Sequence, residues 1–157
     1  MTTLITPREV IDLAFTESGY LPPEAIGTTD ITAAEARYLI PITGAALWQR
    51  LSEGDYPELR SAYAAPAAAC AVRVAVQPAL DLRSGSGGTT VPKSSACQPA
   101  GKEQLIAARR TLRTRLSALL QSLSDHLDTH TSDYPEYNPE ENVLHRVLIA
   151  GGIVLKP

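Results

Sequence analysis

The chain has 157 residues, of which 44% are hydrophobic and 5% aromatic, and its 14 basic and 17 acidic residues give a net charge of −3. This length fits one domain with its own core, and the low aromatic content predicts a core of Leu, Ile, Val and Ala, which suits closely packed helices. Two cysteines, Cys70 and Cys97, are too few for a disulfide framework. No apolar run approaches the roughly 18 to 20 residues that span a bilayer, and residues 1–7 lack the features of a signal peptide. We therefore predict a single domain over residues 1–157, with no membrane contact and a cytoplasmic location.

The first predicted helix begins at Pro7. Thr6 is a suitable N-cap, and Glu9 completes a capping box with it. Residues 10–15 supply the apolar side of this helix. Residues 20–27 follow it and contain two prolines, which predict a loop or a single turn.

A second and a third helix are predicted next. Asp30 or Thr32 is expected to cap the second helix, and Pro41 is expected to end or kink it. The third is short, covers residues 45–51 and is anchored by Trp48.

The fourth helical region is predicted over residues 57–82 because alanine is abundant there. Pro66 and Pro78 cannot donate a backbone hydrogen bond, so each must start a segment or kink one. One long bent helix and two helices in tandem both stay open. A strand is a further alternative, because three valines alternate along the chain: Val72, Val74 and Val76.

Residues 84–101 differ from the rest in composition. They are rich in glycine, serine and proline, so we expect a flexible loop or arm. Eighteen residues without secondary structure are unusual in a compact domain, so this insertion is expected to be functional, ordered only on binding, or a small hairpin. Only residues 89–91 have strand character.

The last long helix is predicted over residues 102–129. Leucines recur along it at helical spacing and form one apolar stripe: Leu105, Leu112, Leu116, Leu119, Leu123 and Leu127.

Residues 134–139 are predicted to form an aromatic turn, and residues 143–157 an extended C-terminal tail that Gly151 and Gly152 divide. Residues 144–149 have a pattern that could be helical, whereas residues 153–155 favour a short strand or an extended tail. An apolar chain end needs a partner, either inside the fold or in a neighbouring subunit. The predicted fold is therefore mainly α: a bundle of about five helices with a long loop or short β-hairpin insertion and this tail.

Charge is unevenly distributed along the chain. Residues 1–60 hold nine acids and four bases, residues 102–115 hold five bases and one acid, and residues 116–142 hold six acids without any Lys or Arg. Separated basic and acidic surfaces can attract copies of a chain head to tail. Solvated helix faces are the alternative explanation.

No pattern of catalytic or cofactor-binding residues is complete. Gly85, Gly87 and Gly88 lack the Gly-Lys-Ser/Thr sequence of a phosphate-binding loop. His126 and His130 have a spacing that could bind zinc, but no third ligand is evident. No serine or cysteine lies in a known nucleophile motif. We therefore predict a protein that is not an enzyme and that has no catalytic residue, no cofactor and no metal site.

Four arginines of the last helix are candidates for an interaction. Arg109, Arg110, Arg113 and Arg115 span about 200° at about 100° per residue, which makes a broad basic flank. Non-specific contact with DNA phosphates is one role for them, although no interleaved aromatic residues would stack on bases. Pairing between helices or subunits is the other.

Several segments, taken in order, resemble a family of head–tail connector (head-completion adaptor) proteins of tailed phages and prophages. These segments are REVIDLAF (8–15), YLPPEAI (20–26), ARYLIPITG (36–44) with the helix at 47–53, YPEYNPEEN (134–142), and residues 147–155 with GGIV.

This resemblance implies a virion structural protein: a helical subunit that forms a homo-oligomeric ring. The ring would lie between the portal and the tail-completion proteins, and DNA would pass non-specifically through its channel. Before incorporation into the virion, the subunit would lie in the cytoplasm of the host cell. The candidate contacts to a neighbouring subunit or the portal are the loop at 84–101 and five residues of the tail: Gly151, Gly152, Ile153, Val154 and Leu155. A small helical DNA-binding or regulatory module, using the flank from Arg109 to Arg115, is the alternative function.

Overall fold

The structure is a computed structural model that describes residues 3–16, 21–85, 88–90, 101–145, 148–150 and 153–155, with the backbone alone for its four strands. The fold is mainly helical, as the sequence predicts. The described residues form five helical bodies: α1 (Pro7–Ala14), a continuous helix over 28–43, α4 (Ala45–Glu53), a continuous helix over 57–80, and α7 (Lys102–Thr129). None of the helices in these ranges is long and apolar enough to cross a membrane.

The start of α1 has the predicted capping box. The Glu9 backbone N–H donates to Thr6 Oγ1 at 3.3 Å, and the Thr6 N–H donates to Glu9 Oε2 at 2.8 Å. Each side chain therefore satisfies a backbone donor that the helix itself leaves unpaired.

The start of the second helix differs from the prediction. A single 3₁₀ turn, η1 (Pro23–Ala25), precedes α2 (Thr28–Ala34), whose N-cap is Gly27. Asp30 lies in the first turn, where its carboxylate accepts the Gly27 N–H at 3.1 Å. The prediction of Asp30 or Thr32 as N-cap is therefore wrong, because Asp30 caps from inside the helix by reaching back to Gly27.

Pro41 and Pro66 each lie inside a continuous helix, two residues after a π-helical turn. The turn η2 (Glu35–Leu39) precedes Pro41 and α3 (Ile40–Thr43), and the turn η3 (Arg60–Ala64) precedes Pro66. Proline lacks an N–H and crowds the carbonyl four residues before it. In a π turn the hydrogen bonds span five residues, so the wider turn relieves both problems. Of the two alternatives predicted for Pro41, the end of the helix is wrong, because α3 continues to Thr43.

The helix over 57–80 is one continuous body. It consists of α5 (Pro57–Leu59), η3 and α6 (Ala65–Leu80), and Pro78 is accommodated near its end. Of the two alternatives for this region, the long helix is confirmed. The strand alternative is wrong, because Val72, Val74 and Val76 all lie in α6.

Two glycines bound α4. Gly44 has a φ of +78° between α3 and α4, and Gly54 has a φ of +101° directly after α4. Residues with a Cβ rarely adopt such angles, so glycine fits these two turns. Trp48 of α4 is 6% exposed and is part of the core, as expected.

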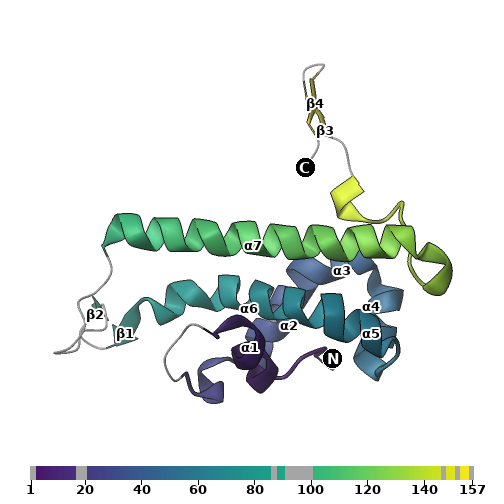
Figure 1. The fold of residues 1–157 in the computed structure, drawn as a ribbon. Coiled ribbons are helices and arrows are strands. Elements are labelled where there is room, and N and C mark those ends of the chain that lie inside the picture. The colour runs from purple at the N-terminus through teal and green to yellow at the C-terminus, as the bar shows by residue number, and fades with distance from the viewer. Residues whose placement is uncertain are drawn as a thin grey trace.

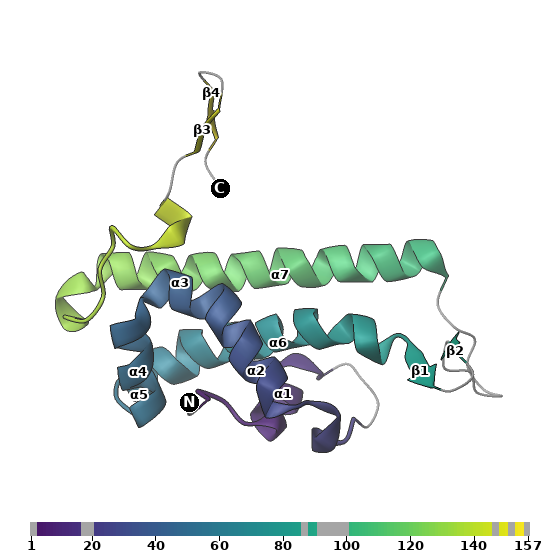
Figure 2. The ribbon, with the colours of Figure 1, turned by 180° about the vertical axis from the view of Figure 1, so that it is seen from behind.

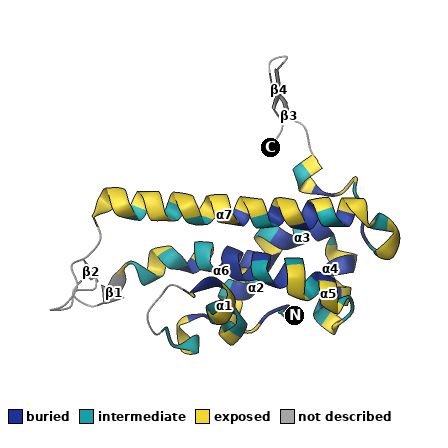
Figure 3. Cartoon of the chain, viewed as in Figure 1, coloured by how far each residue is buried: buried dark blue, intermediate teal, exposed yellow. Residues whose placement is uncertain are grey.

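The core is centred on α6. The alanines at 67, 68, 69 and 71 are fully buried, and the helix packs against α1, α2 and α7. Small side chains let helices approach closely, because the distance between axes depends on the residues at the contact. Figure 3 shows the buried residues concentrated on α6 and on the sides of the other helices that face it.

The helix α7 has the predicted bounds. Of the predicted leucine stripe, Leu116, Leu123 and Leu127 are buried, and Leu120 joins them. Leu105, Leu112 and Leu119 are only half-buried. Figures 1 and 2 show α7 along one side of the bundle, with its first half beside the C-terminal part of α6.

The strands form two small hairpins. β1 (Arg83–Gly85) pairs antiparallel with β2 (Gly88–Thr90), so the hairpin alternative holds for the start of the insertion, whereas residues 91–100 lie outside the described ones. β3 (Leu148–Ala150) pairs antiparallel with β4 (Ile153–Leu155). At Leu148 and Ile149 the structure has a strand in place of the helical alternative, and residues 153–155 form the other strand of this hairpin.

One carboxylic acid is buried in the core. Glu35, in the turn η2, is 3% exposed, and its Oε1 accepts the Leu4 N–H at 2.9 Å. Burial raises the pKa of Glu35 to about 7, although hydrogen bonds from the backbone of Leu4 and Ile5 act in the opposite direction. Glu35 thereby fastens the segment before α1 to the second helix.

Candidate functional site

The first half of α7 extends past the core. From Lys102 to Arg115 the residues are exposed or half-buried, and burial begins at Leu116. Ile106 is 56% exposed, although it is a large apolar side chain. Figure 3 shows this half of α7 mostly exposed. The overhanging half therefore offers apolar surface that the described residues leave uncovered.

A groove of about 410 Å³ lies between α6 and this half of α7. Its charged lining residues are three arginines and one acid, and two leucines supply apolar lining. We call it the basic groove, and its defining residues are Arg73, Asp81, Arg109 and Arg115 with Leu105 and Leu112.

The single acid of the basic groove is already paired. Arg109 donates to Asp81 Oδ2 from Nη2 at 3.0 Å and from Nε at 3.3 Å, and Gln77 donates to Asp81 Oδ1 at 2.9 Å. The Asp81 side chain is 12% exposed. The pair joins the end of α6 to α7 and leaves the charges of Arg73 and Arg115 uncompensated in the lining.

Arg73 lies at the inner end of the groove. Its Nη1 donates to the Ala14 carbonyl, and its guanidinium lies 4.8 Å from the centre of the Phe15 ring. Two buried atoms beside the groove, Arg73 Nε and Gln77 Oε1, have no hydrogen-bond partner within the described ranges. One hydrogen-bond donor and one acceptor beside the groove are therefore left unsatisfied by the described residues.

The structure divides the four predicted arginines between different surroundings. Arg109 is held by Asp81, and Arg115 lines the basic groove. Arg113 lines a separate hollow of about 20 Å³ beside Val74, and Arg110 is exposed outside both.

The sequence reasoning did not single out Arg73. The available signal was that Arg73 is the only charged residue between positions 61 and 80. A lone charge in an apolar helix needs a specific partner or an opening to solvent, and Arg73 has a partner in the Ala14 carbonyl.

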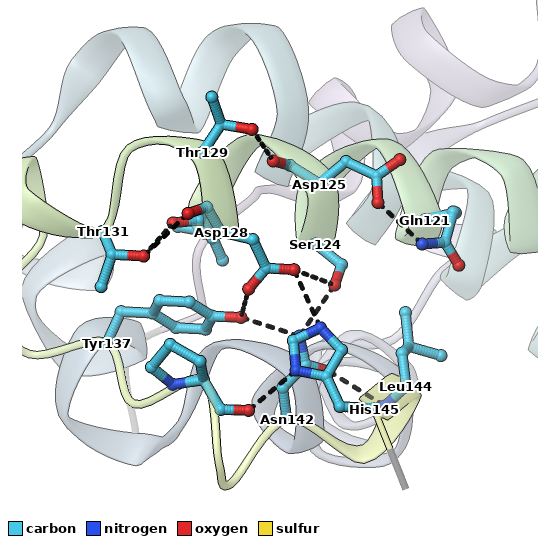
Figure 4. A network of polar contacts seen from close by, with 12 residues as sticks. Gln121, Ser124, Asp125, Asp128, Thr129, Thr131, Tyr137, Asn142, Leu144 and His145 are labelled. Carbon is cyan, nitrogen blue, oxygen red and sulfur yellow. Dashed lines mark hydrogen bonds and ion pairs between the residues drawn. The ribbon is translucent and has the colours of Figure 1, made fainter. Parts of the chain in front are cut away.

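A polar network fixes the chain after α7, as Figure 4 shows. Asp128 accepts from Tyr137 Oη at 2.8 Å, and its other oxygen lies 2.8 Å from His145 Nε2. Fully buried Asn142 donates to Ser124 Oγ and to Tyr137 Oη, both at 2.8 Å. Burial, followed by the contact with Asp128, raises the pKa of Tyr137 to about 12. We call this network the clamp.

The clamp makes a rigid support for an acidic surface segment. We call residues 133–141 the acidic turn, since they include Asp133, Glu136, Glu140 and Glu141. Glu136 is used internally, because it accepts from Arg50 Nε at 3.1 Å and from Tyr56 Oη at 2.8 Å. The other three acids are exposed.

The structure describes only part of the predicted tail. Ile153, Val154 and Leu155 form β4, and Gly151 and Gly152 lie outside the described residues. The sequence shows that all six residues of β3 and β4 are apolar.

The two histidines of α7 form part of an aromatic column. His126 stacks on Tyr63 with ring centres 4.3 Å apart and on His130 at 4.4 Å, and its Nε2 lies 3.0 Å from Tyr134 Oη. Burial, with a smaller contribution from His130, lowers the pKa of His126. Within the described ranges, no three His, Cys, Asp or Glu residues are grouped so that they could hold a metal ion.

A family model matches residues 25–147, which is more than half of the chain. The chain belongs to this family, which is described as a family of unknown function (DUF6712). The match includes the basic groove, the clamp and the acidic turn, and it leaves α1 and the strands β3 and β4 outside. No curated protein and no solved structure matches the chain.

Proposed function

We propose that the protein is a virion structural protein, a head–tail connector subunit that assembles as a ring between the portal and the tail-completion proteins. The ring would let DNA pass without specific recognition. The subunit would lie in the cytoplasm of the host cell before it enters a virion, and its role would need no catalysis and no cofactor. The proposal starts from the resemblance of the five segments given above.

The observation that carries the proposal is the charge polarity of α7. Its 28 residues make a rod of about 42 Å, at about 1.5 Å per residue. The overhanging half carries five bases, and the other half together with the acidic turn carries six acids. A ring needs two different and complementary surfaces on each subunit. The two ends of α7 meet that requirement.

The apolar C-terminal hairpin supports the same proposal. A two-stranded hairpin is marginally stable by itself in water, and all six residues of β3 and β4 are apolar. In Figures 1 and 2 these strands stand apart from the helices. A partner chain that covers them would stabilise the hairpin by burying apolar surface.

A small DNA-binding module is the second candidate. It is favoured by Arg110, Arg113 and Arg115, which are exposed and make no ion pair with any described residue. A duplex would contact these arginines through its phosphates. The acidic half of α7 would repel the phosphates of a duplex that extended along the whole helix.

Native mass spectrometry and light scattering across a range of protein concentrations separate these functions. A ring, alone or together with a portal protein, supports the connector. Duplex DNA is then titrated at several salt concentrations. A strict monomer that binds duplex DNA with a steep salt dependence contradicts the connector and supports the DNA-binding module.

A further inference from the structure

The basic groove has a chemical character that restricts what can fill it. Its two uncompensated arginines, Arg73 and Arg115, favour carboxylates or phosphates, and Leu105 and Leu112 favour apolar contact. A volume of about 410 Å³ suits a few side chains or a small ligand. A DNA duplex presents its phosphates on a wide convex surface, so it fits this recess poorly.

The chain itself contains a segment of matching chemistry. Glu140 and Glu141 are exposed at the end of the acidic turn, between Pro139 and Asn142. The clamp holds this end through fully buried Asn142, so little conformational entropy would be lost on docking. The C-terminal tail matches the groove less well, because residues 144–157 contain Arg146 and Lys156 and no acid.

The acidic turn lies away from the groove of its own chain. The clamp holds the end of the turn beside Ser124, because Asn142 donates to Ser124 Oγ. Ser124 and Arg115 are nine residues apart on α7, which is about 14 Å. The separation exceeds the screening length of about 8 Å at physiological salt. The two surfaces therefore do not neutralise each other within a subunit, and both are open to a second copy.

We propose that the basic groove of one copy receives the acidic turn of a second copy, with Glu140 and Glu141 facing Arg73 and Arg115. This inference rests on the proposed connector function and names its subunit contact. Pro139 lies beside the two acids and would contact the leucines of the groove. Because the groove and the turn lie at opposite ends of α7, each copy can use both, and the contact repeats from head to tail.

Three variants test the contact by analytical ultracentrifugation of the full chain at physiological salt, across concentration. Arg115→Glu places an acid in the groove, and the double variant Glu140→Gln/Glu141→Gln neutralises the turn. Arg110→Glu is the matched control, since it changes the same charge on the same helix outside the groove. We expect the first two to weaken self-association at least about tenfold, as close charge pairs do, and the control to change it by less than about twofold.

Mixing two impaired proteins gives a sharper result. Arg115→Glu keeps its acidic turn, and the double variant keeps its groove, so one contact can form between them. The mixture should form one-to-one complexes and no larger assembly, whereas the wild type should form larger assemblies. Circular dichroism confirms that each variant is folded, which is expected because the substituted residues are exposed.

Several outcomes overturn the inference. These are a wild type that stays monomeric at every concentration, equal weakening by Arg115→Glu and Arg110→Glu, or a mixture that grows like the wild type. If rings form but do not depend on Arg115, the connector function stands and the groove assignment fails. If the monomer binds duplex DNA as described above, both fail.

Discussion

Replacing Glu35 with glutamine tests how the N-terminal segment is fastened to the bundle. Glu35 is 3% exposed, and the pKa of its carboxyl group is raised from 4.5 to about 7 by burial. The folded protein therefore holds this proton more tightly than the unfolded chain. Stability should fall as the pH rises from about 4.5 to about 7 and then level off. A pKa change of this size corresponds to a total loss of about 3 kcal/mol.

The assay is urea unfolding at a series of pH values from 5 to 8. Glu35→Gln should remove the decline, because the amide stays neutral throughout while its oxygen can still accept the Leu4 N–H. Glu24→Gln is the matched control, since Glu24 is exposed in the turn η1.

His126 contributes a pH dependence of the opposite sign. Its pKa is lowered in the folded state, so its contribution to stability is lost as the pH falls. Both proteins contain His126, so the difference between them isolates Glu35. Equal pH dependence in the wild type and Glu35→Gln would refute the reasoning, as would an equal effect of Glu24→Gln.

Three further predictions concern the clamp, the first helix and the tail. Asn142→Ala should lower the free energy of unfolding by about 2 kcal/mol in urea titrations, because it leaves buried polar partners unsatisfied; Asn138→Ala, at an exposed position, should cost much less, and equal losses would contradict the clamp. Thr6→Ala should cost about 1 kcal/mol through loss of the N-cap of α1, measured by thermal unfolding, and no change would mean that the capping box contributes nothing. Deletion of residues 151–157 should impair assembly, measured by native mass spectrometry, more than it lowers the melting temperature, and unchanged assembly would remove the tail from the proposed contact.

Local signals predicted the elements that depend on neighbouring residues. The leucine spacing predicted the extent of α7, and Thr6 with Glu9 predicted the start of α1. Both predictions succeeded because helical periodicity and capping act over three or four residues. The conformation around the prolines could not be predicted from local signals. The relief of Pro41 and Pro66 by π turns depends on packing of the surrounding helix, which the sequence of one turn does not report.

The basic groove and the clamp depended on contacts between distant residues. Arg109 and Asp81 are 28 positions apart, and Asp128 and His145 are 17 positions apart. The sequence predicted the basic flank of α7, but it did not indicate that Arg73 lies opposite Arg115 or that Asp81 neutralises Arg109.

The sequence by itself determined that this protein is mainly helical, that its last long helix is basic at one end and acidic at the other, and that its C-terminus is apolar. These features follow from composition and periodicity. The tertiary structure decided which charges remain uncompensated and where the apolar surface stays open. Both depend on how far α6 and α7 extend beyond the other helices, and packing of the whole chain sets that extent.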